Sequence, residues 1–240
     1  MRFVRTALSA IVVLAGSGAA GCQDDEPEAP IAAADLGQHL FHAPGFSGSR
    51  FNAFACGTCH ADEPDDPTLR SGYSLVGSAF RPTYWGGYET RLIDAVSFCL
   101  VFFMRGETLD PADPRGRALY EYLVRISPDP EPAALPLTVV ANITAVDRGD
   151  ARRGAEVWDE ACAVCHGAPH TGRGRISELA SVVPETSIEF ADRIGANPDL
   201  VLVEKVRHGQ FFGVGGNMPL FSLEALPDED LGALLAYLAE

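Results

Sequence analysis

The sequence predicts an all-α fold made of two small helical domains. Two segments, RGRALYEYLVRI and DEDLGALLAYLAE, repeat apolar residues at helical spacing, and each would close one half of the chain. No segment shows sustained strand alternation, although the β-branched run 137–146 is expected to form an extended crossover. A chain of 240 residues can form two units of about 100 residues each.

A proline-rich segment, SPDPEPAALPL, separates the two halves because it has no usable helical period. We therefore expect a first domain over residues 35–127, a linker over 128–145 and a second domain over 146–240. Residues 23–34 are acidic, contain prolines and lack a periodic apolar pattern, which is typical of a flexible tether.

Residues 1–22 have the organisation of an export signal, with Arg2 and Arg5 followed by an apolar run and small residues. The sequence from Ala19 to Cys22 resembles the cleavage site of a bacterial lipoprotein. That resemblance implies export, a periplasmic location and a lipid anchor on Cys22. Ordinary cleavage nearby is the alternative, and it would leave Cys22 as a free thiol.

The chain is strongly acidic, with a formal charge of −15, and loss of Arg2 and Arg5 with the signal would make it more so. Such a field repels nucleic acid, so we expect no nucleic-acid partner. It favours partners with a basic docking face. No apolar run long enough to span a membrane follows the N-terminus.

Two C-x-x-C-H motifs carry the chemistry, and both match the attachment pattern of c-type haem. Two thiols three positions apart on a helical turn can form thioethers to haem, and the histidine that follows can ligate the iron. A zinc site or redox dithiol is the alternative, but no further Cys pair completes a zinc set. We predict two covalently bound haem c groups, attached and ligated by Cys56, Cys59 and His60 and by Cys162, Cys165 and His166.

The second half also contains a candidate for the sixth iron ligand. Of the three methionines, Met1 leaves with the signal, so each half retains one, Met104 or Met218. Met218 precedes Pro219 and follows a glycine-rich run. With the CAVCH motif and the closing helix, this makes residues 150–240 similar to class I cytochrome c. The resemblance implies a cytochrome c fold for tandem domains, with His166 and Met218 as axial ligands.

The first half leaves the sixth ligand open between Met104, the counterpart of Met218, and Cys99, which has no predicted disulfide partner. If the segment is helical, residues five apart point about 140° apart, so only one would face the iron. The pattern Cys99-x4-Met104-x-Gly106, followed by Leu109-Asp110-Pro111, is similar to the haem domains of thiosulfate dehydrogenases. That resemblance implies His60 and Cys99 as axial ligands and the joining of two thiosulfates into tetrathionate. A buried neutral thiol is the structural alternative.

Two functional hypotheses follow from these motifs. One is a dihaem electron carrier between periplasmic or membrane redox proteins, such as cytochromes and oxidase or dehydrogenase subunits. The other is a dihaem oxidoreductase of small sulfur anions, in which Cys99 would be the catalytic ligand. We favour the carrier. Tyr84 and Trp85 are expected to wall the first haem. Arg207 is expected to lie on a solvated face, with pairing to a haem propionate as the alternative.

Overall fold

The computed structural model describes residues 32–110, 112–209 and 218–240, so Cys22 and the predicted signal lie outside the described residues. Its elements are α1 (Ala33–Phe41), η1 (Pro44–Ser47), α2 (Cys56–Cys59), η2 (Ser78–Phe80), η3 (Trp85–Gly87), α3 (Leu92–Phe102), α4 (Pro114–Arg125), α5 (Ala151–Val157), the π-helical η4 (Trp158–Cys162), α6 (Ala163–His166), α7 (Glu185–Ile194), α8 (Pro198–His208) and α9 (Asp228–Tyr237). The described residues contain helices and one isolated bridge but no strand, which confirms the all-α prediction.

Local sequence explains where several helices begin. Asp113 caps α4 by accepting a hydrogen bond from the backbone N–H two residues later, and Pro114 occupies the first helical position. Asn197 and Pro198 have the same roles at the start of α8. A side-chain oxygen satisfies a backbone donor that the first turn leaves free, and proline has no such donor to satisfy.

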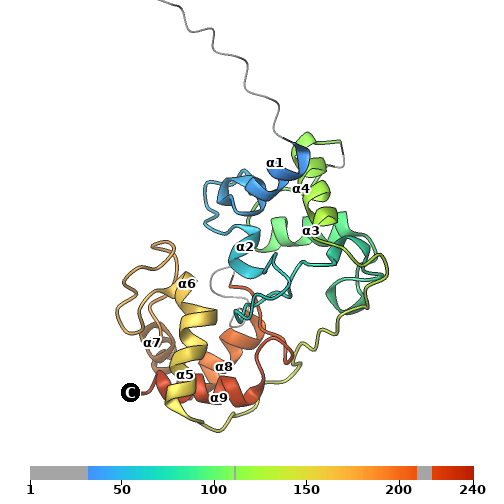
Figure 1. The fold of residues 1–240 in the computed structure, drawn as a ribbon. Coiled ribbons are helices and arrows are strands. Elements are labelled where there is room, and N and C mark those ends of the chain that lie inside the picture. The colour runs from blue at the N-terminus through green and yellow to red at the C-terminus, as the bar shows by residue number, and fades with distance from the viewer. Residues whose placement is uncertain (1–31, 111, 210–217) are drawn as a thin grey trace, which may run out of the picture. The chain divides into compact units, whose positions relative to one another are not determined.

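Each half contains a pair of helices that cross closely, α1 with α4 and α5 with α9 (Figure 1). Gly37 makes the first crossing possible, since a Cβ there would lie 2.0 Å from the carbonyl oxygen of Ala118. Gly154 has the same role in the second, where a Cβ would lie 2.0 Å from the carbonyl oxygen of Ala233. The two crossings are therefore built alike, with a glycine of the first helix against the backbone of the closing helix.

Two hydrophobic clusters lie around these crossings. The N-terminal cluster includes Phe41, Leu119 and Leu123, and the C-terminal cluster includes Trp158 and Leu231. The clusters are not wholly separate, because Leu69 of the N-terminal half packs against the C-terminal cluster and residues Ile31–Glu240 form one compact unit. The domain boundaries expected from the sequence stay a prediction.

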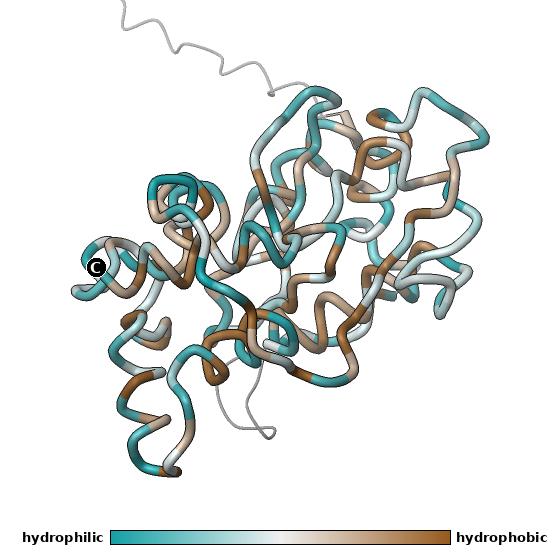
Figure 2. The backbone as a smooth tube through the Cα atoms, turned by 90° about the horizontal axis from the view of Figure 1, so that it is seen from below, coloured by the Kyte–Doolittle hydropathy of each residue, from teal (hydrophilic) through white to brown (hydrophobic). Residues whose placement is uncertain are grey.

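Hydrophobic residues occur along the described chain in short stretches separated by hydrophilic ones (Figure 2). None of the helices in the described ranges combines the length and the apolar composition that spanning a bilayer requires.

Candidate haem sites

The N-terminal motif lies on a single helical turn. Cys56 and Cys59 begin and end α2, and the backbone N–H of Ala55 donates to Thr58 Oγ1 at 3.0 Å. His60 follows directly, with its Nδ1 2.6 Å from the carbonyl oxygen of Tyr73. Since Nδ1–H donates to that carbonyl, Nε2 is left to bind a metal. Burial lowers the pKa of His60, which favours the neutral imidazole that a metal needs.

In the C-terminal motif the histidine is oriented in the same way, but the two cysteines lie on two different helical segments. Cys162 ends the π-helical turn η4, and Cys165 and His166 lie on α6. His166 Nδ1 lies 2.8 Å from the carbonyl oxygen of Ser181, so its Nε2 is also left for a metal. Trp158 fixes the end of α6 by donating from Nε1 to the carbonyl oxygen of Gly167 at 3.0 Å. Burial lowers the pKa of His166 as well.

A backbone hydrogen bond fixes the chain next to each imidazole, and beside His60 the packing is tight. The carbonyl of Cys59 accepts from the N–H of Gly72, and that of Cys165 from the N–H of Ile176, both at 3.0 Å. Gly72 lies so near His60 that a Cβ would be 2.3 Å from its Cε1. A side chain at position 72 would therefore displace the ring that is to ligate iron.

The thiols of both motifs favour the neutral form. Burial raises the pKa of Cys56, Cys162 and Cys165 to about 12, and it also raises the pKa of Cys59. A structural zinc site needs about four such ligands, and the described residues contain no cluster of three or more His, Cys, Asp or Glu that could hold a metal ion. Paired neutral thiols beside an oriented imidazole fit covalently attached haem.

Two cavities receive these residues. The C-terminal cavity has a volume of about 570 Å³ and is lined by Cys162, Cys165, His166 and Met218. The N-terminal cavity, about 180 Å³, is lined by Cys56, Cys59, His60, Cys99 and Met104. The structure thus brings together each set of site residues that the sequence predicts, while the glycine-rich run before Met218, residues 210–217, lies outside the described residues.

The second of these sites lies in a part of the chain that matches a known protein family. The family described as cytochrome c oxidase, cbb3-type, subunit III, matches residues 149–238. Residues 149–238 are a cytochrome c domain. A cytochrome c domain carries covalently bound haem c and transfers electrons through it, which assigns that chemistry to this part of the chain.

The chain is also similar to a solved structure, that of thiosulfate dehydrogenase (TsdBA) from Marichromatium purpuratum in its as-isolated form. The sequence identity is 18% and the TM-score is 0.42. The match covers 91% of this chain and 48% of that chain, so this chain spans about half the length of the solved protein. Among curated proteins, none matches the sequence.

Outside the cytochrome c domain, the two candidate sixth ligands of the first site both line the N-terminal cavity. The expectation that only one of Cys99 and Met104 would face the iron assumed one continuous helix, and that condition is not met, because α3 ends at Phe102 and Met104 lies beyond it. Burial and the neighbouring thiols of Cys56 and Cys59 raise the pKa of Cys99. Met104 belongs to the buried N-terminal cluster. The choice between them stays open.

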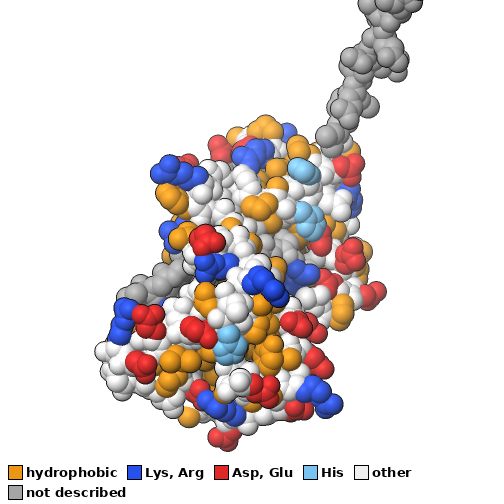
Figure 3. All heavy atoms as spheres, turned by 90° about the vertical axis from the view of Figure 1, so that its left-hand side faces the viewer, with side chains coloured by type: hydrophobic (Ala, Val, Ile, Leu, Met, Phe, Trp, Pro, Cys, Tyr) orange, Lys and Arg blue, Asp and Glu red, His pale blue; other side chains and the backbone are white. Residues whose placement is uncertain are grey.

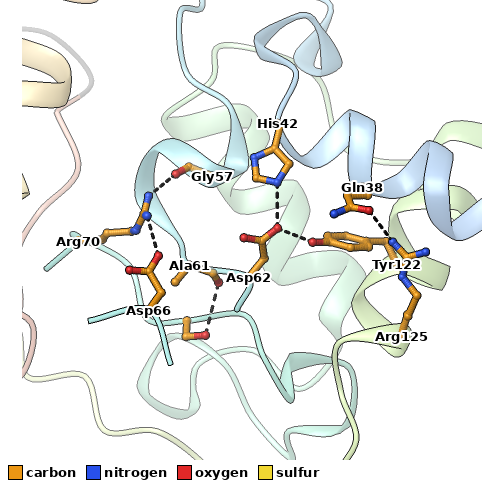
Figure 4. A network of polar contacts seen from close by, with 10 residues as sticks. Gln38, His42, Gly57, Ala61, Asp62, Asp66, Arg70, Tyr122 and Arg125 are labelled. Carbon is orange, nitrogen blue, oxygen red and sulfur yellow. Dashed lines mark hydrogen bonds and ion pairs between the residues drawn. The ribbon is translucent and has the colours of Figure 1, made fainter. Parts of the chain in front are cut away.

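A polar network ties the segment after the first motif to the helix pair (Figure 4). Asp62 accepts a hydrogen bond from the Tyr122 hydroxyl of α4 and lies 2.9 Å from His42 Nε2 at the end of α1. Arg70 donates to the carbonyl oxygen of Gly57 at 2.6 Å and pairs with Asp66 at 2.8 Å. The Asp62 contacts hold the segment after the CGTCH turn against α1 and α4, and the Arg70 contacts hold the turn against residues 66–70.

Sequence reasoning missed part of the surroundings. Tyr84 and Trp85 line the N-terminal cavity as expected, but Leu135 and Leu137 of the linker do so too, with Pro219, Leu220 and Ser222 of the cytochrome c domain. Arg207 is only 1% exposed, contrary to the expected solvated position. Its guanidinium donates to three backbone carbonyls and to Asp228. No local sequence signal marks these long-range contacts.

Proposed function

We propose that this protein is a dihaem cytochrome that relays electrons between redox partners through two adjacent haem c groups. The observation that carries the proposal is a wall common to both cavities. Five residues line the N-terminal and the C-terminal cavity alike: Phe54, Cys59, Ser71, Phe103 and Pro219. Groups held on the two sides of one layer of side chains are close enough for an electron to pass between them.

The thiols themselves support this closeness, since the Cys59 thiol contributes to raising the pKa of Cys165. Haem supplies one-electron exchange when it is bound. The chain's own residues orient the two imidazoles and keep the cavities apolar. They also fill the space between the two cavities. Such work needs no acid–base residue.

The surface supports exchange with other proteins at the C-terminal cavity. Three apolar residues that line it are exposed, Phe51 at 58%, Val164 at 50% and Leu179 at 75%. On the face drawn in Figure 3, acidic and basic side chains are interspersed, although the chain as a whole has a charge of −15. We propose partners with a basic docking face, and export with a lipid anchor at Cys22 as the means of holding the carrier at a membrane.

Removal of one Cys pair at a time tests the proposal. We expect two haem increments in the intact mass of the mature protein, and one in each of the variants Cys56→Ala/Cys59→Ala and Cys162→Ala/Cys165→Ala. A relay needs both groups, so either variant should lose most of the electron flow from a donor to an acceptor cytochrome. A single haem in the wild-type protein, or half of the flow retained in each variant, would contradict the relay.

A second function is favoured by Cys99, whose thiol contacts the N-terminal cavity instead of a disulfide partner. As ligand of the first haem it would suit an oxidoreductase of small sulfur anions. Joining two thiosulfates into tetrathionate releases two electrons, one for each haem.

Electron paramagnetic resonance separates the two functions. A low-spin thiolate signal that disappears in Cys99→Ala and persists in Met104→Leu, together with haem reduction by thiosulfate, would favour the oxidoreductase. Two histidine–methionine signals and no reduction by thiosulfate would leave the carrier.

A further inference from the structure

Residues 135–140 of the linker, which we call the strap, lie between the two halves in sequence but contribute to the first haem site. Leu135 and Leu137 line the N-terminal cavity. Leu137 also covers Gly86, where a Cβ would lie 3.2 Å from the Leu137 Cβ. The strap has no regular secondary structure, so its position depends on contacts with the parts of the chain that it crosses.

One anchor holds the strap to the cytochrome c domain. The carboxylate of Glu224 accepts from both the backbone N–H of Thr138, at 2.9 Å, and its hydroxyl. The Leu223 N–H donates in return to the Thr138 carbonyl oxygen at 3.1 Å. The hydrogen bond from the Thr138 hydroxyl is the main cause that lowers the pKa of Glu224 to about 2, so the acceptor is ionised at neutral pH.

A second anchor reaches His60, which would ligate the iron of the first site. The Tyr73 hydroxyl donates to the carbonyl oxygen of Pro136 at 2.6 Å, while the backbone carbonyl of Tyr73 accepts from His60 Nδ1. The residue that orients the imidazole therefore also holds the strap. The strap thus contacts the N-terminal site through Tyr73 and Leu137, and the C-terminal half through Leu223, Glu224 and His208, the last of which binds the carbonyl oxygen of Val140.

We infer that the strap encloses the first haem site, and that Glu224 is a positioning residue that holds the strap over this site. This inference rests on the proposed function. A docked strap excludes water from the N-terminal cavity and steadies Tyr73 behind His60. A drier surround disfavours the more positive ferric state, so docking raises the reduction potential of the first haem and leaves the second unchanged.

The test uses the full holoprotein with the variant Glu224→Ala, which removes both Thr138 acceptors. Hydrogen exchange of a peptide that covers residues 135–140 should become about threefold to tenfold faster, as expected when hydrogen bonds to a charged acceptor are lost. One of the two midpoint potentials should fall. Comparison with Cys162→Ala/Cys165→Ala, which keeps only the first haem, identifies which potential that is.

Two further variants keep the outcome decisive. Leu137→Ala shortens the wall without touching the anchor and should lower the same potential, whereas Glu229→Gln, at an exposed glutamate in the first turn of α9, should change neither readout. Faster exchange with both potentials unchanged, a shift of the second haem alone, or no effect of either strap variant would overturn the inference. Absence of haem from the wild-type protein would instead contradict the proposed function.

Discussion

The two halves share a helix crossing but differ in how the chain reaches the C-x-x-C-H motif. In the C-terminal half, α5, η4 and α6 follow one another without a break from Ala151 to His166. In the N-terminal half, α1 ends at Phe41, and a separate segment containing η1 precedes Cys56. The crossing is therefore the part that both halves keep, while the path to the attachment turn varies.

The cavities differ more than the crossings. The C-terminal cavity, about 570 Å³, has Met218 on its wall, whereas the N-terminal cavity, about 180 Å³, has both Cys99 and Met104. The N-terminal cavity also takes walls from the strap. The comparison teaches that one scaffold can hold two differently enclosed sites.

Arg207→Met should destabilise the protein most. Its guanidinium is buried and donates to the carbonyl oxygens of Phe221, Ser222 and Leu226 as well as to Asp228. Loss of the donor removes the hydrogen bonds to the carbonyls of Phe221 and Leu226, whereas the Ser222 carbonyl keeps the Leu226 N–H. We expect a loss of about 3 kcal/mol in the free energy of unfolding, measured by denaturant titration. The exposed Arg193→Met should cost less than about 0.5 kcal/mol. A loss below about 1 kcal/mol at position 207 would show that the carbonyls find other partners.

Equivalent glycines test whether the crossings are alike. Gly37→Ala and Gly154→Ala each place a Cβ 2.0 Å from a backbone oxygen of the closing helix, so the helices must move apart. We expect similar losses of about 2 kcal/mol in the free energy of unfolding, because overpacking costs about that much. Gly45→Ala is the control, since a Cβ there would meet nothing within 4 Å. Clearly unequal losses would mean that the crossings are not equivalent.

Two tyrosines near these crossings should differ. The Tyr122 hydroxyl donates to Asp62, whereas no hydrogen-bond partner of the Tyr237 hydroxyl occurs among the described residues. Tyr122→Phe should therefore cost about 1 kcal/mol in thermal or denaturant unfolding, and Tyr237→Phe almost nothing. Equal effects would indicate that the network around Asp62 adds no stability to the N-terminal half.

Much of this architecture was predictable because its signals are local. The two thiols and the histidine of each motif are neighbours in sequence, and the closing helices show their apolar period directly. The end of α3 has no such signal directly beside it, since the first glycine after Phe102 is Gly106 and the first proline is Pro111. The apolar pattern of the sequence therefore continues past Phe102, where the helix ends.

The rest depends on contacts between distant residues. Leu137 reads as part of a proline-rich linker, and its place in the N-terminal cavity is set by Tyr73 and Glu224, which are far away in sequence. Arg207 is likewise a charged residue near the end of a helix, which predicts an exposed side chain. Its burial is explained by its hydrogen bonds to backbone carbonyls of residues 221–226. Local periodicity carries no information about such partners.

The smallest expected effect concerns pH and the strap. His208 Nε2–H donates to the carbonyl oxygen of Val140, and its Nδ1 lies 3.0 Å from Glu204; both bonds need the doubly protonated ring, and they raise the pKa of His208. A raised folded-state pKa means that this stabilisation is complete below the ordinary value of about 6.5 and is lost as pH rises through the folded-state value. Hydrogen exchange at residues 138–140, corrected for its intrinsic pH dependence, should therefore quicken modestly across that range, and His208→Gln should remove the dependence. A dependence that survives in His208→Gln would assign it to another group.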